Sequence, residues 1–465
     1  MPRYDKPVSM KESSQSVPHR HGGLRGMVSG FLQSTMLRVL RIGINVVVTG
    51  LLARHLGSAG FGSLAASLAL VSLLYSLAEL GMGRLLVREL LRDGADKNEV
   101  LGSSFFTRLV ASGVLFSLLV LYVVACRPAQ GTLLVVYGFV LLTHPVTDVL
   151  AWFEAERRLI TAAWCQFAGF AISMAAIIGG IVWNAPLWFF ALTFVIECLI
   201  TTILLLVNYH QLGGSWKGWR WHKQRALNFL LESRYEIAAQ LSLLMLLRVD
   251  TIMVEAMCGE TEVGYYSAAV RVSEVAYFLP MMLAGFILPP LMERKQRDSG
   301  EYQRGVADYF GMTIAIMLPV SLGIGLTADW IVKLLFGPEF IAAKPMLVVH
   351  AWALVPFALG IARTQYLTLE KRLWANIPAV VTALIINLVL NWMWIPAHGG
   401  LGAAWATLIA YTVAWVLSTP CMAATRELTG LMLRGITNLP RLLNEARMRL
   451  VQHELPPEPV SRSQP

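Results

Sequence analysis

The chain has 465 residues, of which 56% are hydrophobic and only 14% are charged. A soluble domain carries about 25% charged residues, so this chain has too few polar side chains to cover a water-exposed surface. Its 14 Trp and 19 Phe residues also exclude a disordered chain. The net charge of +9 would suggest nucleic-acid binding in a soluble protein. In an integral membrane protein, the class that remains, such an excess reflects topology instead.

Twelve segments are long and apolar enough to cross a bilayer as helices, which takes about 20 residues each. The residues before the first of them contain no apolar run, so we expect no cleavable signal peptide. The first and seventh segments carry the most charge. The twelve predicted spans are 31–53, 62–82, 104–126, 132–150, 161–183, 187–207, 233–256, 264–290, 306–328, 341–366, 374–395 and 402–424.

The segments that connect the spans alternate in charge. Of the 38 Lys and Arg residues, 27 fall in the two tails and the segments on their side, eight in the spans, and only Arg54, Arg127 and Lys333 on the other side. The positive-inside rule therefore predicts that both termini are cytoplasmic. The predicted organisation is a cytoplasmic tail (1–26), a six-helix bundle (27–207), a cytoplasmic linker (208–232), a second six-helix bundle (233–424) and a cytoplasmic tail with an amphipathic helix (425–465).

Two glycines recur at the same place in each half of the chain. Gly57 and Gly62 follow the first span, and Gly259 and Gly264 follow the seventh at a constant offset of 202 residues. Because each half has an even number of spans, such a repeat is parallel, and substrate sites in repeat transporters lie between the halves near the midplane. The alternative is that glycine is simply common in tight hairpins.

Sixteen charged residues fall within the predicted spans, eight of each sign. Each costs about 2.5–3.5 kcal/mol at the centre of a lipid-facing helix, so they should face the protein interior or a wet cavity. Snorkelling to the interface is the alternative for those near span ends. These are Arg108, Arg234, Lys344, Arg363, Glu79, Asp148 and Asp308.

The central charges are candidates for a substrate site. Arg38 and Arg41 lie on one face of the first span, and paired guanidinium donors suit a phosphate group. Arg248 and Asp250 lie deep in the seventh span, and Arg271 and Glu274 lie three residues apart in the eighth. Salt bridges that lock helices together are the alternative for both pairs. Further candidates are Asn387 and Asn391 for sugar hydroxyls, and Glu197 and His350 for ion or proton coupling; packing and interhelical hydrogen bonds are the alternatives for these four.

Motifs of catalysis and cofactor binding are missing from the sequence. It contains no GxSxG, HExxH or P-loop pattern, and its five cysteines show no metal-ligand spacing. We therefore expect neither an enzyme nor a bound cofactor or metal.

Four stretches carry a resemblance to a known family. LLARHLGSAGFGSLAASLALVSLLYSLAELGMGRLLVREL (51–90) and the longer stretch 247–291 resemble the Wzx-type polysaccharide flippases, and FGPEF (336–340) and IPAHGGLGAAWATLIA (395–410) complete the pattern. This family belongs to the multidrug/oligosaccharidyl-lipid/polysaccharide exporter (MOP) superfamily. The resemblance implies an all-α membrane protein whose two six-helix bundles form a V around a central cavity.

The resemblance also implies a function. Such a protein flips a polyprenyl-pyrophosphate-linked oligosaccharide across the bacterial inner membrane by alternating access, for exopolysaccharide or O-antigen synthesis. Its expected partners are this lipid-linked substrate, membrane lipids, and a polysaccharide polymerase and chain-length regulator, with no nucleic acid. The alternative is a cation-coupled small-molecule (multidrug) exporter of the same superfamily.

Overall fold

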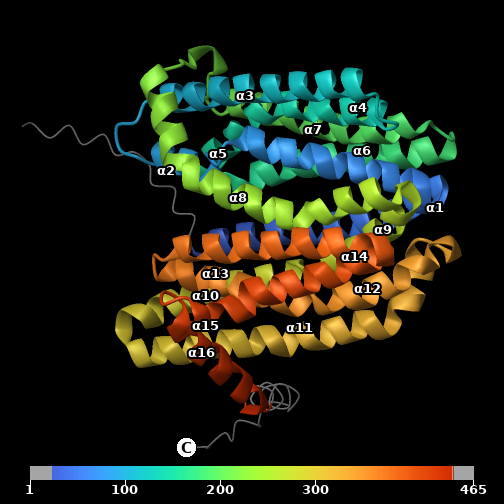
Figure 1. Ribbon diagram of the computed structural model, residues 1–465. Helices are drawn as coiled ribbons and strands as arrows, with labels where there is room; N and C mark the ends of the chain where they lie inside the picture. Colours follow the sequence, from blue (N-terminus) through green and yellow to red (C-terminus); the bar gives the residue numbers. More distant parts are fainter. Residues whose placement is uncertain (1–23, 442–443, 445–465) are drawn as a thin grey trace, which may run out of the picture.

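The computed structural model describes residues 24–441 and residue 444. Within these residues the protein consists of helices, turns and loops without any strand. The long helices run side by side in roughly one direction (Figure 1). The prediction of an all-α membrane protein is therefore confirmed.

Ten helical segments of the described residues are long and apolar enough to cross a membrane. Two of them, Met36–Leu90 and Leu373–Cys421, contain 55 and 49 residues, about twice the length that one crossing needs. Each is interrupted by one glycine with non-helical backbone, Gly57 in the first and Gly399 in the second. Counted as two helices each, these segments bring the total to the twelve predicted spans.

The first half of the chain forms seven α-helices in the described residues. Helix α3 begins where the Asp96 side chain accepts hydrogen bonds from the backbone N–H groups of Asn98 and Glu99. The fourth predicted span is made of two helices joined by a short 3₁₀ turn at Pro145, a residue that interrupts a regular α-helix. The helices are α1 (Leu24–Glu79), α2 (Gly83–Leu90), α3 (Lys97–Cys126), α4 (Gly131–Thr143), α5 (Asp148–Ala155), α6 (Leu159–Val182) and α7 (Leu187–Gln211).

The second half begins with a long helix that takes up part of the predicted linker. Helix α7 ends at Gln211 and α8 begins at Lys223, so the loop between them is shorter than the predicted 208–232, because both helices continue beyond the apolar spans. The helices are α8 (Lys223–Cys258), α9 (Glu260–Ala276), α10 (Phe278–Arg297), α11 (Ser299–Leu335), α12 (Ala343–Trp352), α13 (Leu354–Leu369), α14 (Asn376–Thr412), α15 (Ser418–Cys421) and α16 (Arg426–Thr437).

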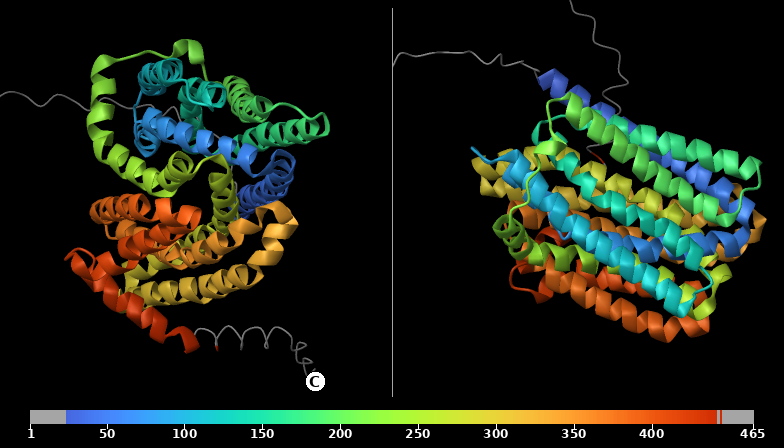
Figure 2. Two further views of the ribbon diagram at one scale, coloured as in Figure 1. Left: turned by 45° about the vertical axis from the view of Figure 1, so that its right-hand side comes forward. Right: turned by 90° about the horizontal axis from the view of Figure 1, so that it is seen from above.

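The two halves of the chain occupy different parts of the molecule. In Figure 1, α2 to α7 lie in the upper part and α10 to α16 in the lower part, with α8 and α9 near the boundary. Helix α8 packs against α14 of the second half, whereas α1 packs against α8 and α9. The contact between the halves therefore runs along α1, α8 and α9, as the two views of Figure 2 also show.

The repeated glycines lie where the halves touch. A Cβ atom on Gly62 would lie 1.9 Å from the Glu260 carbonyl oxygen, and one on Gly264 would lie 2.0 Å from the Ser58 carbonyl oxygen. The Ser58 backbone N–H also donates a hydrogen bond of 3.0 Å to the Glu339 carboxylate. At this end of the molecule, which we call the outer end because the hairpins at Gly57 and Gly259 lie there, the halves meet backbone to backbone.

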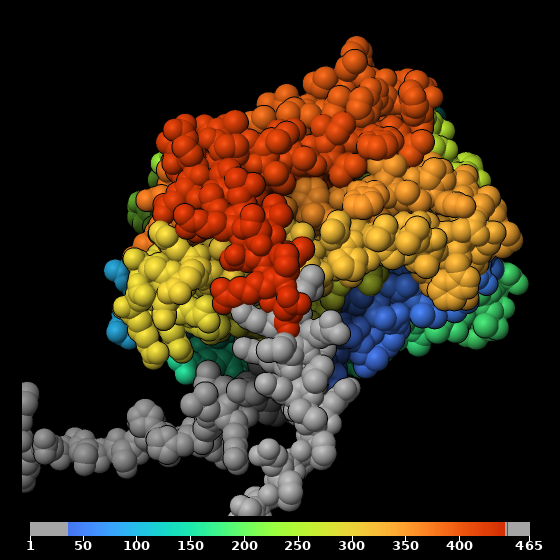
Figure 3. All heavy atoms as spheres, turned by 90° about the horizontal axis from the view of Figure 1, so that it is seen from below, coloured from blue at the N-terminus to red at the C-terminus, as the bar shows by residue number. Residues whose placement is uncertain are grey.

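Helix α16 lies across α11 at the opposite side of the second half (Figure 3). Its Leu428, Leu431 and Met432 are buried, while Leu433 and Ile436 are 59% and 50% exposed. This arrangement gives the helix two apolar faces, one packed and one free. The amphipathic helix that the sequence predicts beyond residue 437 lies mostly outside the described residues.

Candidate functional site

Two adjoining cavities lie between the halves. The first has a volume of about 210 Å³ and lies between α1 and α9; the second, of about 220 Å³, lies between α1, α7, α8 and α9. Arg271 and Glu274 line both cavities. The polar residues that line only one of them are Arg41, Asn45 and Thr49 in the first, and Ser72, Arg248, Thr251 and Ser267 in the second.

Arg271 is the cation that stands out in these cavities. It is partly buried, and among the described residues it has no hydrogen-bond or ion-pair partner. The nearby Glu274 is engaged by Arg248, whose Nη1 lies 2.8 Å from its Oε1. The alternative of an Arg271–Glu274 bridge within one helix is therefore not what the structure shows, because the carboxylate binds a guanidinium from the neighbouring α8. Arg271 is left with free N–H donors beside the cavities.

Arg41 faces the first cavity but is already paired. Its Nη2 lies 2.5 Å from Oε1 of Glu197 on α7, and its guanidinium lies 5.0 Å from the centroid of the Phe170 ring. Its side chain nevertheless remains 40% exposed, so it can still receive a ligand. Arg38, one turn earlier, is exposed and lines neither of these two cavities.

Asp250 is separated from the cavities by its own hydrogen bonds. It is 3% exposed and accepts hydrogen bonds from the Tyr266 hydroxyl, from Thr407 Oγ1 at 3.0 Å and from the Thr251 N–H at 2.8 Å. Arg248, two residues earlier, points to Glu274 instead. Asp250 thus joins α8, α9 and α14 inside the second half.

Three further candidates are buried away from the two cavities. Asn387 and Asn391 are completely buried, and Asn391 Nδ2 donates a hydrogen bond of 3.0 Å to Asn387 Oδ1. His350 is 2% exposed and shares a hydrogen bond of 2.7 Å with Ser273 Oγ. Their positions favour the packing alternative over direct contact with a substrate.

The snorkelling alternative is wrong for three of the residues near span ends. Arg108 and Asp148 are 3% and 1% exposed and form an ion pair inside the first half. Arg363 is completely buried and donates hydrogen bonds to the Ala414 carbonyl at 2.6 Å and to Ser418 Oγ at 3.0 Å. These groups find partners on neighbouring helices, a possibility that span position alone does not show.

The cavities also contain small polar residues that the sequence analysis missed. Asn45 and Thr49 follow Arg41 at spacings of four residues, and residues four apart lie on one helix face. That spacing is the signal that could have identified them. Ser72 and Ser267 carry no such signal, since single serines are common in membrane helices.

An apolar groove continues from the first cavity. It has a volume of about 410 Å³ and shares Val46, Val272 and Val275 with the first cavity. Phe278, Leu279, Ile324 and Leu335 complete its wall. A polar chamber therefore opens into an apolar groove between α1, α10 and α11.

Membrane-spanning helices in two halves around a polar cavity are the architecture of a membrane transporter. The chain belongs to the polysaccharide biosynthesis protein family, whose sequence model matches residues 51–345. A probable low-salt glycan biosynthesis flippase, Agl15 of Haloferax volcanii, is 22% identical over 186 residues. That match covers 40% of this chain and 39% of the relative.

Solved structures share the fold. The lipid II flippase MurJ in an inward closed conformation superposes with a TM-score of 0.73 at 12% identity, covering 91% of this chain and 93% of that one. An inward-facing multidrug resistance MATE family transporter of the MOP superfamily gives a TM-score of 0.68 at 12% identity, covering 84% and 95%. The fold is therefore that of the MOP superfamily, and these relatives are flippases and transporters, not enzymes.

Proposed function

We propose that the protein flips a polyprenyl-pyrophosphate-linked oligosaccharide across the membrane by alternating access. The observation that carries this proposal is Arg271, a partly buried guanidinium without an ion-pair partner in the described residues, at the junction of both cavities. An unpaired buried cation is costly unless a ligand compensates it. A diphosphate supplies the charge and the paired acceptors that a guanidinium binds best.

The surroundings of Arg271 suit the rest of this amphipathic ligand. Asn45, Thr49 and Ser72 offer hydrogen bonds to sugar hydroxyls. The apolar groove beside the first cavity would take the start of the polyprenyl chain, so that the headgroup crosses while the tail stays among apolar groups. Arg41 would add a second cation by exchanging Glu197 for phosphate.

The alternative of a multidrug exporter for cations receives less support. Both acidic residues near the cavities are engaged, Glu197 by Arg41 and Glu274 by Arg248. A cationic drug would have to displace an arginine to reach a carboxylate. The likeness to multidrug transporters concerns the fold only.

The cellular setting that we propose follows from the charge distribution and the substrate. Both termini would lie in the cytoplasm of a bacterial inner membrane, and 27–207 and 233–424 would move against each other as two bundles. A polymerase and a chain-length regulator would then use the flipped repeat unit for exopolysaccharide or O-antigen synthesis. None of the described residues needs a cofactor for this cycle.

The test is to replace Arg271. We expect Arg271→Ala to lower glycan export at least about tenfold, the loss expected for one charge-assisted contact, and Arg271→Lys to retain part of it. Surface glycan is measured in a host that lacks the native gene, with protein amount and thermal stability measured in parallel. Arg304→Ala, an exposed arginine far along the chain from the cavities, is the control.

Two outcomes would decide against the proposal. Full export by a stable Arg271→Ala protein would remove Arg271 from the substrate site. Normal delivery of the lipid-linked repeat unit to the outer leaflet in a strain without this protein, and without a redundant flippase, would remove the function itself.

A further inference from the structure

The loop between α7 and α8 carries exposed tryptophans among exposed cations. Trp216 and Trp221 are 55% and 53% exposed. Lys217, Arg220 and Lys223 are exposed as well, and within the described part of the chain their side chains have no ion-pair partner. We call these five residues the linker surface.

This exposure does not result from a loose loop. Trp219 turns inward and donates a hydrogen bond of 3.1 Å to the Tyr209 hydroxyl. The Arg220 N–H donates to the Asn98 carbonyl at 3.3 Å, and the His222 N–H donates to Ser103 Oγ at 3.1 Å. A Cβ atom on Gly102 would lie 2.4 Å from the Arg220 nitrogen, so the loop lies directly on α3. The linker surface is presented outward by a fixed backbone.

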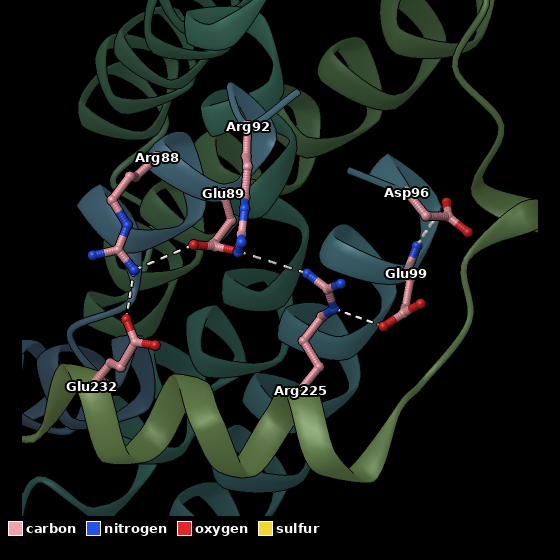
Figure 4. A network of polar contacts seen from close by, with 7 residues as sticks. All are labelled: Arg88, Glu89, Arg92, Asp96, Glu99, Arg225 and Glu232. Carbon is pink, nitrogen blue, oxygen red and sulfur yellow. Dashed lines mark hydrogen bonds and ion pairs between the residues drawn. The ribbon is translucent and has the colours of Figure 1, made fainter. Parts of the chain in front are cut away.

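The start of α8 is fixed in the same way by ion pairs. Figure 4 shows Arg225 and Glu232 pointing from α8 toward α2 and α3. Arg225 Nε lies 2.7 Å from Glu99, and Glu232 lies 2.5 Å from Arg88. Arg225 also lies 3.8 Å from Glu89. On this face of α8 the basic groups drawn all have acidic partners, in contrast to the linker surface.

A different side of the same helix turns is apolar and uncovered. Leu227, Leu231 and Tyr235 are 43%, 59% and 63% exposed, and their spacing of four residues places them in one stripe. Leu227 and Leu231 lie before the predicted span 233–256. Helix α8 has 36 residues, which corresponds to roughly 54 Å, whereas the hydrocarbon core is about 30 Å thick. The start of α8 therefore extends beyond the hydrocarbon, at the level of the headgroups, where an apolar stripe needs lipid to cover it.

We propose that the linker surface, together with this stripe, binds anionic phospholipids of the adjacent leaflet. Indole rings favour the boundary between headgroups and acyl chains, and basic groups near this boundary attract anionic headgroups. The three unpaired cations supply the charge complementarity, and the Trp and Leu side chains supply contacts for the acyl chains. The lipid would fasten the connection between the two halves of the chain to the membrane surface.

The experiment compares lipids of different charge on the full-length protein. Purified protein in detergent is titrated with phosphatidylglycerol or phosphatidylcholine, and bound lipid is counted by native mass spectrometry. We expect the wild type to prefer phosphatidylglycerol. The triple variant Lys217→Gln, Arg220→Gln and Lys223→Gln should lose this preference by roughly fivefold for each cation removed, with unchanged thermal stability.

A matched variant separates a local site from general charge. Arg294→Gln, Arg297→Gln and Arg304→Gln remove three exposed cations on the same predicted side of the membrane, and this protein should keep the preference. An unchanged preference in the linker variant, or an equal loss in the matched variant, would overturn the proposal. Equal binding of both lipids by the wild type would also overturn it and would point to a protein partner instead.

Discussion

The arginines inside the membrane differ in what compensates them. Arg108 pairs with Asp148, Arg248 with Glu274 and Arg41 with Glu197. Arg271, in contrast, lines both cavities without such a partner among the described residues. A buried ion pair stabilises a helix contact only if both partners remain, whereas a lone cation beside a cavity is available to a ligand.

Arg41 and Glu197 can be separated experimentally into a structural and a substrate-binding role. Arg41→Ala should destabilise the protein by about 1–2 kcal/mol, because Glu197 would lose its counter-charge in a largely buried place. The double variant Arg41→Ala, Glu197→Gln should recover that stability. Thermal unfolding in detergent and glycan export are measured on both. Recovery of stability without recovery of export identifies Arg41 as a substrate ligand, whereas recovery of both identifies the pair as structural.

At the level of elements, the repeated hairpins form the contact at the outer end. Gly62 and Gly264 allow the backbones of α1 and α9 to approach more closely than any side chain permits. Arg54 adds a clasp by donating hydrogen bonds to the carbonyl groups of Lys333 and Leu335, both at 3.0 Å. Alternating access requires this contact to open, so these residues should set the balance between closed and open forms.

Gly62→Ala should shift that balance toward an open outer end. The added methyl group would collide with the Glu260 carbonyl, so a cysteine at Thr49 in the first cavity, in a cysteine-free background, should react severalfold faster with an impermeant maleimide added outside intact cells. Gly113→Ala is the control, because a Cβ atom there meets nothing within 4 Å. Unchanged labelling in a folded Gly62→Ala protein would show that the glycine contact does not hold the outer end closed.

At the scale of the whole molecule, the distribution of basic residues predicts which ends of the helices face the cytoplasm. Ala129 lies in the hairpin between α3 and α4, and Ser215 lies in the loop between α7 and α8; both are exposed. Their helix ends lie on opposite sides of the predicted membrane.

Ala129→Cys should therefore react with an impermeant thiol reagent in intact cells. Ser215→Cys should react only after the cells are opened, and both are examined in a cysteine-free background. The reverse pattern would invert the topology and place both termini outside. Equal labelling of both positions in intact cells would contradict the span count between them.

The sequence by itself determined the membrane class, the helical spans and the resemblance to flippases. These properties depend on apolarity, which accumulates along a continuous segment, and on hairpin glycines and flanking charges that stay next to their helices. It also identified the charged residues near the cavities, because a charge within an apolar span is conspicuous wherever it points.

The tertiary structure alone decided how these charges are paired. The partners of Arg41, Arg108 and Arg248 lie on other helices, 156, 40 and 26 residues away along the chain. Which acid reaches which base depends on helix packing and side-chain direction. The same packing left Arg271 free beside the cavities and brought Gly62 against the hairpin of the other half, so the candidate site became visible only in three dimensions.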